Sequence, residues 1–311
     1  MSNNFISIII PVFNEENNIQ PLIKRLLPVL KSYEYEIIFV NDGSTDNTSN
    51  NIKELAKKNP NIRLVSFARN FGHQMALTCG YRFSKGDCVI SIDSDLQDPP
   101  EAIPRLIEKW QNGAKVVYAK RQEREGETIF KKQTAYIFYR LINFLSDTNI
   151  PEDVGDFRLL DRQVVNFLNN LNEQSRFLRG LVAWGGYPAE YIYFKREKRY
   201  SGKTHYSITK MFNFAMEGII SFSIKPLRLA SYFGFIVGAF GFTGIVYHII
   251  RKLVHPQYYV IGWTGLFVGI MFLGGIQLMT IGIIGEYVGK TYQEVRKRPQ
   301  YLIGETINIK V

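Results

Sequence analysis

The sequence predicts an α/β protein with a doubly wound, mostly parallel sheet, followed by amphipathic helices and two membrane-spanning helices. Over about the first 120 residues, short apolar runs alternate with helical patterns, which is typical of βαβ units. Polar clusters follow three of these runs, at the positions where an open α/β sheet binds its ligands. Two long uncharged apolar runs lie in the last third of the chain.

Five short runs rich in Val, Ile and Phe indicate buried strands, each ending near turn-forming residues. The predicted strands cover residues 5–13, 36–40, 62–67, 87–92 and 115–119. Helical patterns fill the intervals between them. The predicted helices cover residues 19–31, the stretch from Asp46 to about Lys58, the small residues around Ala76 and Gly80, and the stretch from Pro99 to about Gly113.

The pattern changes after about residue 127. Residues 130–145 and 208–224 have amphipathic helical patterns, and the position of the second, between a basic run and an apolar run, favours an interfacial helix over a core helix. Residues 229–250 and 260–284 carry no formal charge. Each run exceeds the roughly 20 residues that a helix needs to cross a bilayer, so two spans are predicted. A buried hairpin of a soluble protein is the alternative.

The net charge of +10 lies almost wholly in the part of the chain that holds the apolar runs. Residues 1–195 carry 24 Lys and Arg against 23 Asp and Glu, whereas residues 196–311 carry 14 against 5. Basic side chains beside spans attract anionic lipid headgroups, so the distribution favours a membrane partner. No basic helix or aromatic–basic strand motif of a nucleic-acid module is visible, so no nucleic-acid partner is expected.

The basic residues also predict an orientation. Six Lys and Arg residues lie before the first span or after the second, against Arg251 and Lys252 in the connecting loop. Because basic residues favour the cytosolic side, this bias predicts that the catalytic part and both termini are cytosolic. Glycines in both spans either pack the hairpin or permit a homo-oligomer. The expected parts are a catalytic domain (1–206), an amphipathic juxtamembrane helix (207–228), a transmembrane hairpin (229–286) and a cytosolic tail (287–311).

Two carboxylates, Asp93 and Asp95, follow the fourth predicted strand. Hard oxygen ligands suit Mg²⁺ or Mn²⁺, which proteins usually hold with one or two carboxylates plus substrate phosphates. An Asp-x-Asp pair alone arises often by chance, and a turn with a helix cap would explain residues 41–44. Because residues 11–15, Asp42 and the Asp pair all follow neighbouring strands, together they predict a nucleotide-diphosphate site.

Four motifs together resemble those of the family 2 inverting glycosyltransferases, which have the GT-A fold. The motifs are residues 11–16, 41–46, 69–72 and 93–101. Within that family the chain is most similar to polyprenyl-phosphate glycosyltransferases, which include dolichyl-phosphate mannose synthases and bacterial bactoprenol glucosyltransferases. Residues 198–207, residues 210–223 and the two C-terminal spans are similar to the bactoprenol branch, so the resemblance covers nearly the whole chain.

The resemblance implies an inverting, metal-dependent hexosyltransferase. The expected donor is UDP-glucose, and the expected acceptor is a polyprenyl (undecaprenyl-type) phosphate at the cytosolic membrane face. A mannosyltransferase using GDP-mannose and a membrane-anchored, catalytically inactive protein that binds sugar nucleotides remain alternatives. A processive polysaccharide synthase is disfavoured, because the sequence has no Gln-x-x-Arg-Trp motif and only two predicted spans.

The resemblance also implies roles for individual residues. The residues expected to bind the nucleotide sugar are Pro11, Phe13, Asn14, Glu15, Asp42, Asp93, Ser94 and Arg121. The metal, Mg²⁺ or Mn²⁺, is expected on Asp93, Asp95 and Gln97. Lys131, Lys132 and Lys203 are expected at the acceptor phosphate, although Lys131 and Lys132 also suit a plain interfacial pair.

Asp95, Asp156 and Arg199 are expected to take part in catalysis. Asp156 acts either as a base or as an orienting residue, because an acceptor phosphate is already anionic at neutral pH. His73 and His248 have no partners at metal-binding spacing, and a structural role is predicted for both.

Overall fold

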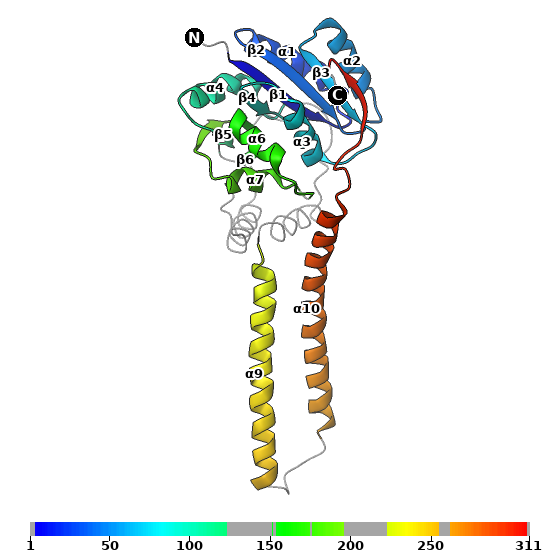
Figure 1. Cartoon of the computed structure of the whole chain (residues 1–311), viewed down its shortest axis with the longest axis vertical. Coiled ribbons are helices and arrows are strands. Elements are labelled where there is room, and N and C mark those ends of the chain that lie inside the picture. Colours follow the sequence, from blue (N-terminus) through cyan, green and yellow to red (C-terminus); the bar gives the residue numbers. More distant parts are fainter. Residues whose placement is uncertain are drawn as a thin grey trace.

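The computed structural model describes residues 4–122, 151, 154–174, 176–195, 223–254 and 262–309. A layered α/β unit lies at one end of the molecule, and two long helices project away from it side by side (Figure 1). The predicted amphipathic helix over residues 130–145, and nearly all of the one over residues 208–224, lie outside the described residues.

The α/β unit is built on one sheet of eight strands. The strands are β1 (Phe5–Val12), β2 (Glu34–Asn41), β3 (Ile62–Phe67), β4 (Cys88–Ser91), β5 (Val116–Arg121), β6 (Val154–Asp161), β7 (Ala189–Phe194) and β8 (Ile303–Ile307). Their order across the sheet is β7-β5-β6-β4-β1-β2-β3-β8. Only β6 and β8 run antiparallel to their neighbours among these strands. The five predicted strands are confirmed to within two residues at each end.

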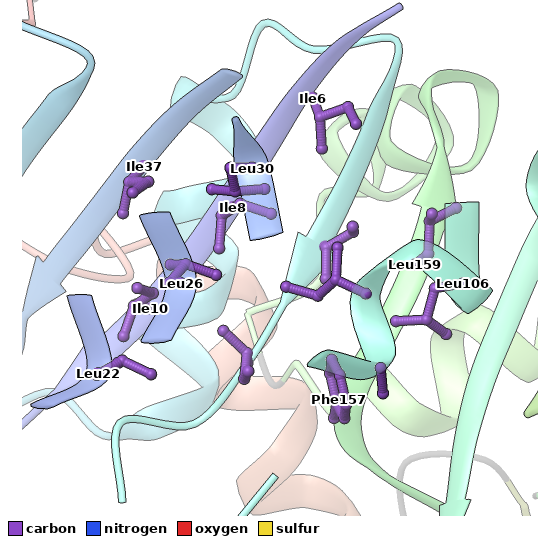
Figure 2. Close-up of a cluster of buried hydrophobic side chains, with 14 of the residues drawn as sticks. Ile6, Ile8, Ile10, Leu22, Leu26, Leu30, Ile37, Leu106, Phe157 and Leu159 are labelled. Atoms are coloured by element: carbon purple, nitrogen blue, oxygen red, sulfur yellow. The ribbon is translucent and has the colours of Figure 1, made fainter. Parts of the chain in front are cut away.

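Helices cover both faces of the sheet, as the doubly wound prediction requires. One face carries α1 (Ile19–Leu30), α2 (Thr48–Lys58), the short η1 (Pro100–Ala102) and α4 (Ile103–Gln111), and the other carries α3 (His73–Phe83), α6 (Arg162–Asn170) and α7 (Leu178–Trp184). Alternate residues of β1 point to opposite faces. Ile8 and Ile10 pack toward Leu26 of α1 (Figure 2), whereas Ile9 belongs to the cluster of α3 and α7.

The strand register brings the predicted clusters to one edge of the sheet. β1 pairs in parallel with both β2 and β4, so the loops that follow these three strands leave the sheet at the same edge. β6 runs the opposite way, and its Arg158 pairs with Ser91 near the end of β4. The start of β6, which includes Asp156, therefore lies beside the end of β4.

Helices α9 (Lys225–Val254) and α10 (Trp263–Arg296) are long and apolar enough to cross a membrane. Most of their large apolar side chains are exposed. At about 1.5 Å per residue, α10 is roughly 50 Å long and exceeds the ~30 Å hydrocarbon core, so its polar last turns extend beyond such a core. α9 begins at Lys225, so residues 225–228 belong to this helix and not to a separate juxtamembrane helix.

The segment after α10 returns to the α/β unit, which differs from the expectation that residues 287–311 form a separate tail. Strand β8 pairs antiparallel with β3 and forms one edge of the sheet. The Tyr301 ring stacks on Phe67, with centroids 4.9 Å apart and an angle of 16° between the rings. The sheet is therefore completed by residues that follow both apolar helices in the sequence.

A buried ionic cluster joins the first three strands near the edge opposite the predicted site. Glu36 is only 1% exposed. Its Oε1 accepts hydrogen bonds from Ser7 Oγ at 2.5 Å and from the Lys85 backbone N–H at 2.6 Å. Its Oε2 forms an ion pair with Arg63. A charge this deeply buried requires such partners, because an unpaired one would be strongly unfavourable.

Candidate active site

The Asp93–Asp98 turn follows β4 directly. Asp95 is 8% exposed, and its Oδ1 accepts a hydrogen bond from the Gln97 backbone N–H at 3.1 Å. Leu96 adopts a left-handed conformation with φ of 61°. This conformation costs a non-glycine residue roughly 1–2 kcal/mol. The Leu96 side chain is buried in the main core, and that burial offsets the cost and fixes the turn.

Hydrogen bonds join the loops that follow β1 and β2. The Asn14 backbone N–H donates to Ser44 Oγ at 3.0 Å, and Asn14 Oδ1 accepts from the Thr45 N–H at 2.8 Å. The Glu15 backbone N–H donates to Thr48 Oγ1 at 2.8 Å. Asn14 itself has a left-handed backbone with φ of 56°, which Asn tolerates better than most residues. These hydrogen bonds therefore hold together two of the residue clusters that are predicted to bind the nucleotide.

Asp42 stabilises the loop over residues 69–72 through hydrogen bonds to its backbone. Its carboxylate accepts hydrogen bonds from the backbone N–H groups of Phe71 at 2.6 Å and Gly72 at 2.9 Å. Gly72 has a φ of 98°, which allows the chain to turn into α3. Burial raises the pKa of Asp42, although the two backbone hydrogen bonds oppose that shift. The structure thus gives Asp42 a role in shaping the loop, and its contact with a nucleotide stays a prediction.

Asp156 lies at the centre of a charged cluster. Arg179, on α7, forms a bidentate pair with it, with Nε 3.1 Å from Oδ1 and Nη2 3.0 Å from Oδ2. His73, the first residue of α3, places its Nε2 3.2 Å from Asp156 Oδ2 and 3.7 Å from Asp93 Oδ1. The imidazole therefore lies between the carboxylate of the Asp-x-Asp motif and the carboxylate of β6.

The charges of the cluster shift its pKa values. Burial alone would raise the pKa of Asp156, but the Arg179 guanidinium and the His73 hydrogen bond hold it well below its usual range. Burial opposes protonation of His73, yet the hydrogen bond that its ring donates to Asp156 and the charge of Asp93 raise the pKa of His73. Burial raises the pKa of Asp93, and the nearby His73 opposes this shift. Asp156 is consequently an anion whose two oxygens are already engaged.

The other predicted residues fall at the same edge or outside the described residues. Pro11 is buried within β1, Phe13 is 41% exposed beyond its end, and Ser94 is 5% exposed in the Asp93–Asp98 turn. Arg121 ends β5, and within the described part of the chain its buried Nε has no hydrogen-bond partner. The remaining predicted residues lie outside the described residues, and these are Lys131, Lys132, Arg199 and Lys203.

Two residues of the cluster were not predicted as site residues. The structural role predicted for His73 does not describe its position, because its ring joins two carboxylates of the site. The position of His73 directly after the motif over residues 69–72 could have indicated a site residue. Arg179 belongs to no motif, and α7 brings it beside Asp156 by packing in the same apolar cluster as α3, α6 and β6.

The acidic residues suit a metal that is shared with a substrate. Among the described residues, no three or more His, Cys, Asp or Glu side chains are grouped as a ready-made metal site. Asp93 and Asp95 supply two carboxylates at one strand end, with Asp93 one-third exposed. A hard divalent cation bound by one or two carboxylates and completed by phosphate oxygens matches this arrangement.

The sequence motifs and the strand-end cluster agree with a known family. The model of glycosyl transferase family 2 matches residues 7–168. This chain belongs to that family. The transferase is 45% identical over 300 residues to the bactoprenol glucosyl transferase of Shigella phage SfV, covering 96% of this chain and 97% of that protein. It is also 45% identical over 300 residues to the prophage bactoprenol glucosyl transferase homolog of Escherichia coli (strain K12), covering 96% and 98%.

Among solved structures, the transferase is similar to glucosyl-3-phosphoglycerate synthase from Mycobacterium tuberculosis in complex with phosphoglyceric acid. The identity is 20%, the TM-score is 0.48, and the match covers 70% of this chain and 79% of that one.

Proposed function

We propose that this transferase moves glucose from UDP-glucose to a polyprenyl phosphate of the undecaprenyl type at a membrane surface. The observation that carries the proposal is the combination, in one chain, of a strand-end carboxylate site with two exposed apolar helices, the second of which is followed by a strand of the same sheet. The two phage-type relatives, which are named for glucosyl transfer to bactoprenol, support the same substrate pair.

In the proposed reaction, an oxygen of the acceptor phosphate attacks the anomeric carbon of the sugar. The bond from that carbon to the β-phosphate oxygen of UDP breaks, and UDP leaves with the electron pair. Attack from the face opposite UDP inverts the configuration and gives a β-linked lipid-phosphate sugar. No proton has to leave the attacking group, because a phosphate is already anionic at neutral pH.

Asp93 and Asp95 would hold Mg²⁺ or Mn²⁺ together with the diphosphate, with Gln97 beside them. When bound, the cation neutralises the charge that develops on the leaving UDP. Phe13, which is 41% exposed, is available to pack on the nucleotide base, beside the Asn14 and Glu15 loop. Arg121, with its unpartnered Nε at the same edge, suits a phosphate oxygen because guanidinium groups pair well with phosphates.

Asp156 is assigned an orienting role in this proposal. Its carboxylate accepts two hydrogen bonds from Arg179 and one more contact from His73, so it is a poor proton acceptor. A carboxyl whose pKa is lowered by folding stays ionised above its unfolded value of about 3.9. The ionisation of Asp156 should therefore not change the transfer rate between pH 5.5 and 8.5.

A transfer assay tests the proposal. Purified full-length protein in detergent is given labelled UDP-glucose, polyprenyl phosphate and Mn²⁺, with GDP-mannose and other UDP-hexoses in parallel. Label is expected in the organic phase from UDP-glucose, and EDTA should abolish it, with recovery on adding Mn²⁺ or Mg²⁺. Label from GDP-mannose alone would replace glucose by mannose, and no label from any donor would favour a protein that only binds sugar nucleotides.

We further propose that α9 and α10 span the membrane with both ends of the hairpin on the cytosolic side. The support is the excess of Lys and Arg outside the hairpin over the two basic residues of its loop. Single cysteines at Lys53 and Gln257, placed in a background without Cys79 and Cys88, test this orientation. In intact cells, a membrane-impermeant thiol reagent should label the Gln257 position and not the Lys53 position. The reverse labelling would contradict the orientation.

A further inference from the structure

The loop between α6 and α7, residues 171–177, contacts the end of helix α10. Both carboxylate oxygens of Glu294 accept the backbone N–H of Gln174, at 2.9 and 3.0 Å. Gln300 Nε2, just beyond the helix, donates to the carbonyl of Glu173 at 2.5 Å. Hydrogen bonds to an ionised carboxylate are stronger than neutral ones. The outer side of this loop is therefore held by Glu294 near the end of α10 and by Gln300 just beyond it.

Arg176 holds the inner side of the same loop. Arg176 is 7% exposed, and its Nη1 donates to the carbonyl of Leu168 at 3.0 Å. Its Nη2 donates to the carbonyl of Leu171. The last carbonyls of a helix lack partners within the helix, so Arg176 closes the end of α6. The described residues of the loop are thus held between α6 and the end of α10.

The loop leads directly into the charged cluster of the site. The Leu178 backbone N–H, at the start of α7, donates to Gln74 Oε1 at 3.2 Å. The next residue, Arg179, forms the bidentate pair with Asp156. α7 has only seven residues, and a helix this short depends on its tertiary contacts. The position of Arg179 therefore depends on the loop that precedes it.

We propose that Glu294 is a positioning residue for the transfer reaction, which it serves by holding the 171–177 loop so that Arg179 reaches Asp156. The proposal rests on the proposed glucosyl transfer for its activity readout. Glu294 touches no substrate in this proposal and acts only through the loop and Arg179. Glu294 thereby links the end of α10 to the charged cluster through the loop that precedes α7.

The variant Glu294→Ala in the full chain tests this role by steady-state kinetics. We expect kcat to fall roughly 10- to 100-fold, the size of effect that small misplacements at a site produce. KM for UDP-glucose should stay unchanged, because the donor is proposed to bind the loops after β1 and β2, whereas Glu294 acts through the loop before α7. The matched control is Glu305→Gln, which breaks the 2.6 Å ion pair with Lys53 on the same C-terminal segment. An equal loss of kcat in the control would overturn the proposal.

A double-mutant cycle tests the route through Arg179. If Glu294 acts through Arg179, then Glu294→Ala should lower kcat little further in a chain that already carries Arg179→Lys. Fully additive losses would overturn the proposal, since they would mean that the two residues act independently.

Amide hydrogen exchange gives a readout that needs no activity. Exchange over residues 176–184 should rise in Glu294→Ala and stay at the wild-type level in Glu305→Gln. Unchanged exchange in Glu294→Ala would overturn the positioning role even if activity falls. If the wild-type protein forms no labelled lipid, the proposed function fails, and exchange alone then decides whether Glu294 orders the loop.

Discussion

Replacing Asp95 by Asn is expected to lower kcat for glucosyl transfer by roughly 10²–10³-fold, the loss typical of removing one electrostatic group at a reacting centre. Asn keeps the Oδ1 that accepts the Gln97 N–H at 3.1 Å, so the turn should survive. It removes the negative charge that would hold the cation against the diphosphate. The measurement is labelled lipid formed per minute at saturating UDP-glucose and Mn²⁺.

The control for this variant lies at the other end of the same strand. Asp87 precedes β4, and its Oδ2 accepts the Phe5 N–H at 2.9 Å, away from the site edge. Asp87→Asn should transfer glucose at the wild-type rate. Thermal unfolding of Asp95→Asn should match the wild type. This would show that the fall in kcat comes from the removed charge and not from a loss of folded protein. A fully active Asp95→Asn enzyme would contradict the assigned metal role.

Replacing Glu36 by Ala is expected to destabilise the protein by about 3–5 kcal/mol, the usual result of removing one partner of a buried ion pair. The change leaves the mostly buried Arg63 guanidinium without its carboxylate. It also removes the acceptor of the Ser7 hydroxyl and the Lys85 N–H. Thermal unfolding of the full chain in detergent should show a Tm lower by on the order of 10 °C.

A surface pair provides the comparison for Glu36. Arg25 and Glu101 form a bidentate pair with a shortest contact of 2.7 Å, but their side chains are 30% and 53% exposed. Water and salt screen such a pair, so Glu101→Gln should cost less than about 1 kcal/mol. If Glu36→Ala were as mild as Glu101→Gln, the buried cluster would contribute little to the stability of the sheet.

The first half of the fold could be predicted because its information is local. Strands β1 to β5 are apolar runs that end at turn residues, and the first helix, α1, has a clear apolar stripe. The parallel arrangement then places the groups after β1, β2 and β4 at one edge, so the region of the site followed from the sequence. The resemblance to family 2 glycosyltransferases rests on the same groups after β1, β2 and β4. The family match and the relatives confirm it.

The remaining strands and two site residues depend on contacts between distant parts of the chain. β6 contains Asp156 and the fully buried Arg158, so it lacks the uninterrupted apolar run of a buried strand. β8 has five residues, and it pairs with β3 after both apolar helices have intervened. Arg179 reaches the site through the packing of a short helix. Hydrophobic periodicity carries no signal for any of these features.

Strand β8 also imposes an order on biosynthesis. The ribosome makes β3 early and β8 only after both apolar helices have been translated, and domains generally begin to fold as their N-terminal parts emerge. Until β8 arrives, β3 is an open edge strand, with backbone groups available to pair with another chain. The nascent protein therefore passes through a stage in which both apolar helices have been translated while the sheet still lacks its last edge strand. Closure of that edge has to wait until β8, which follows both apolar helices, has been translated.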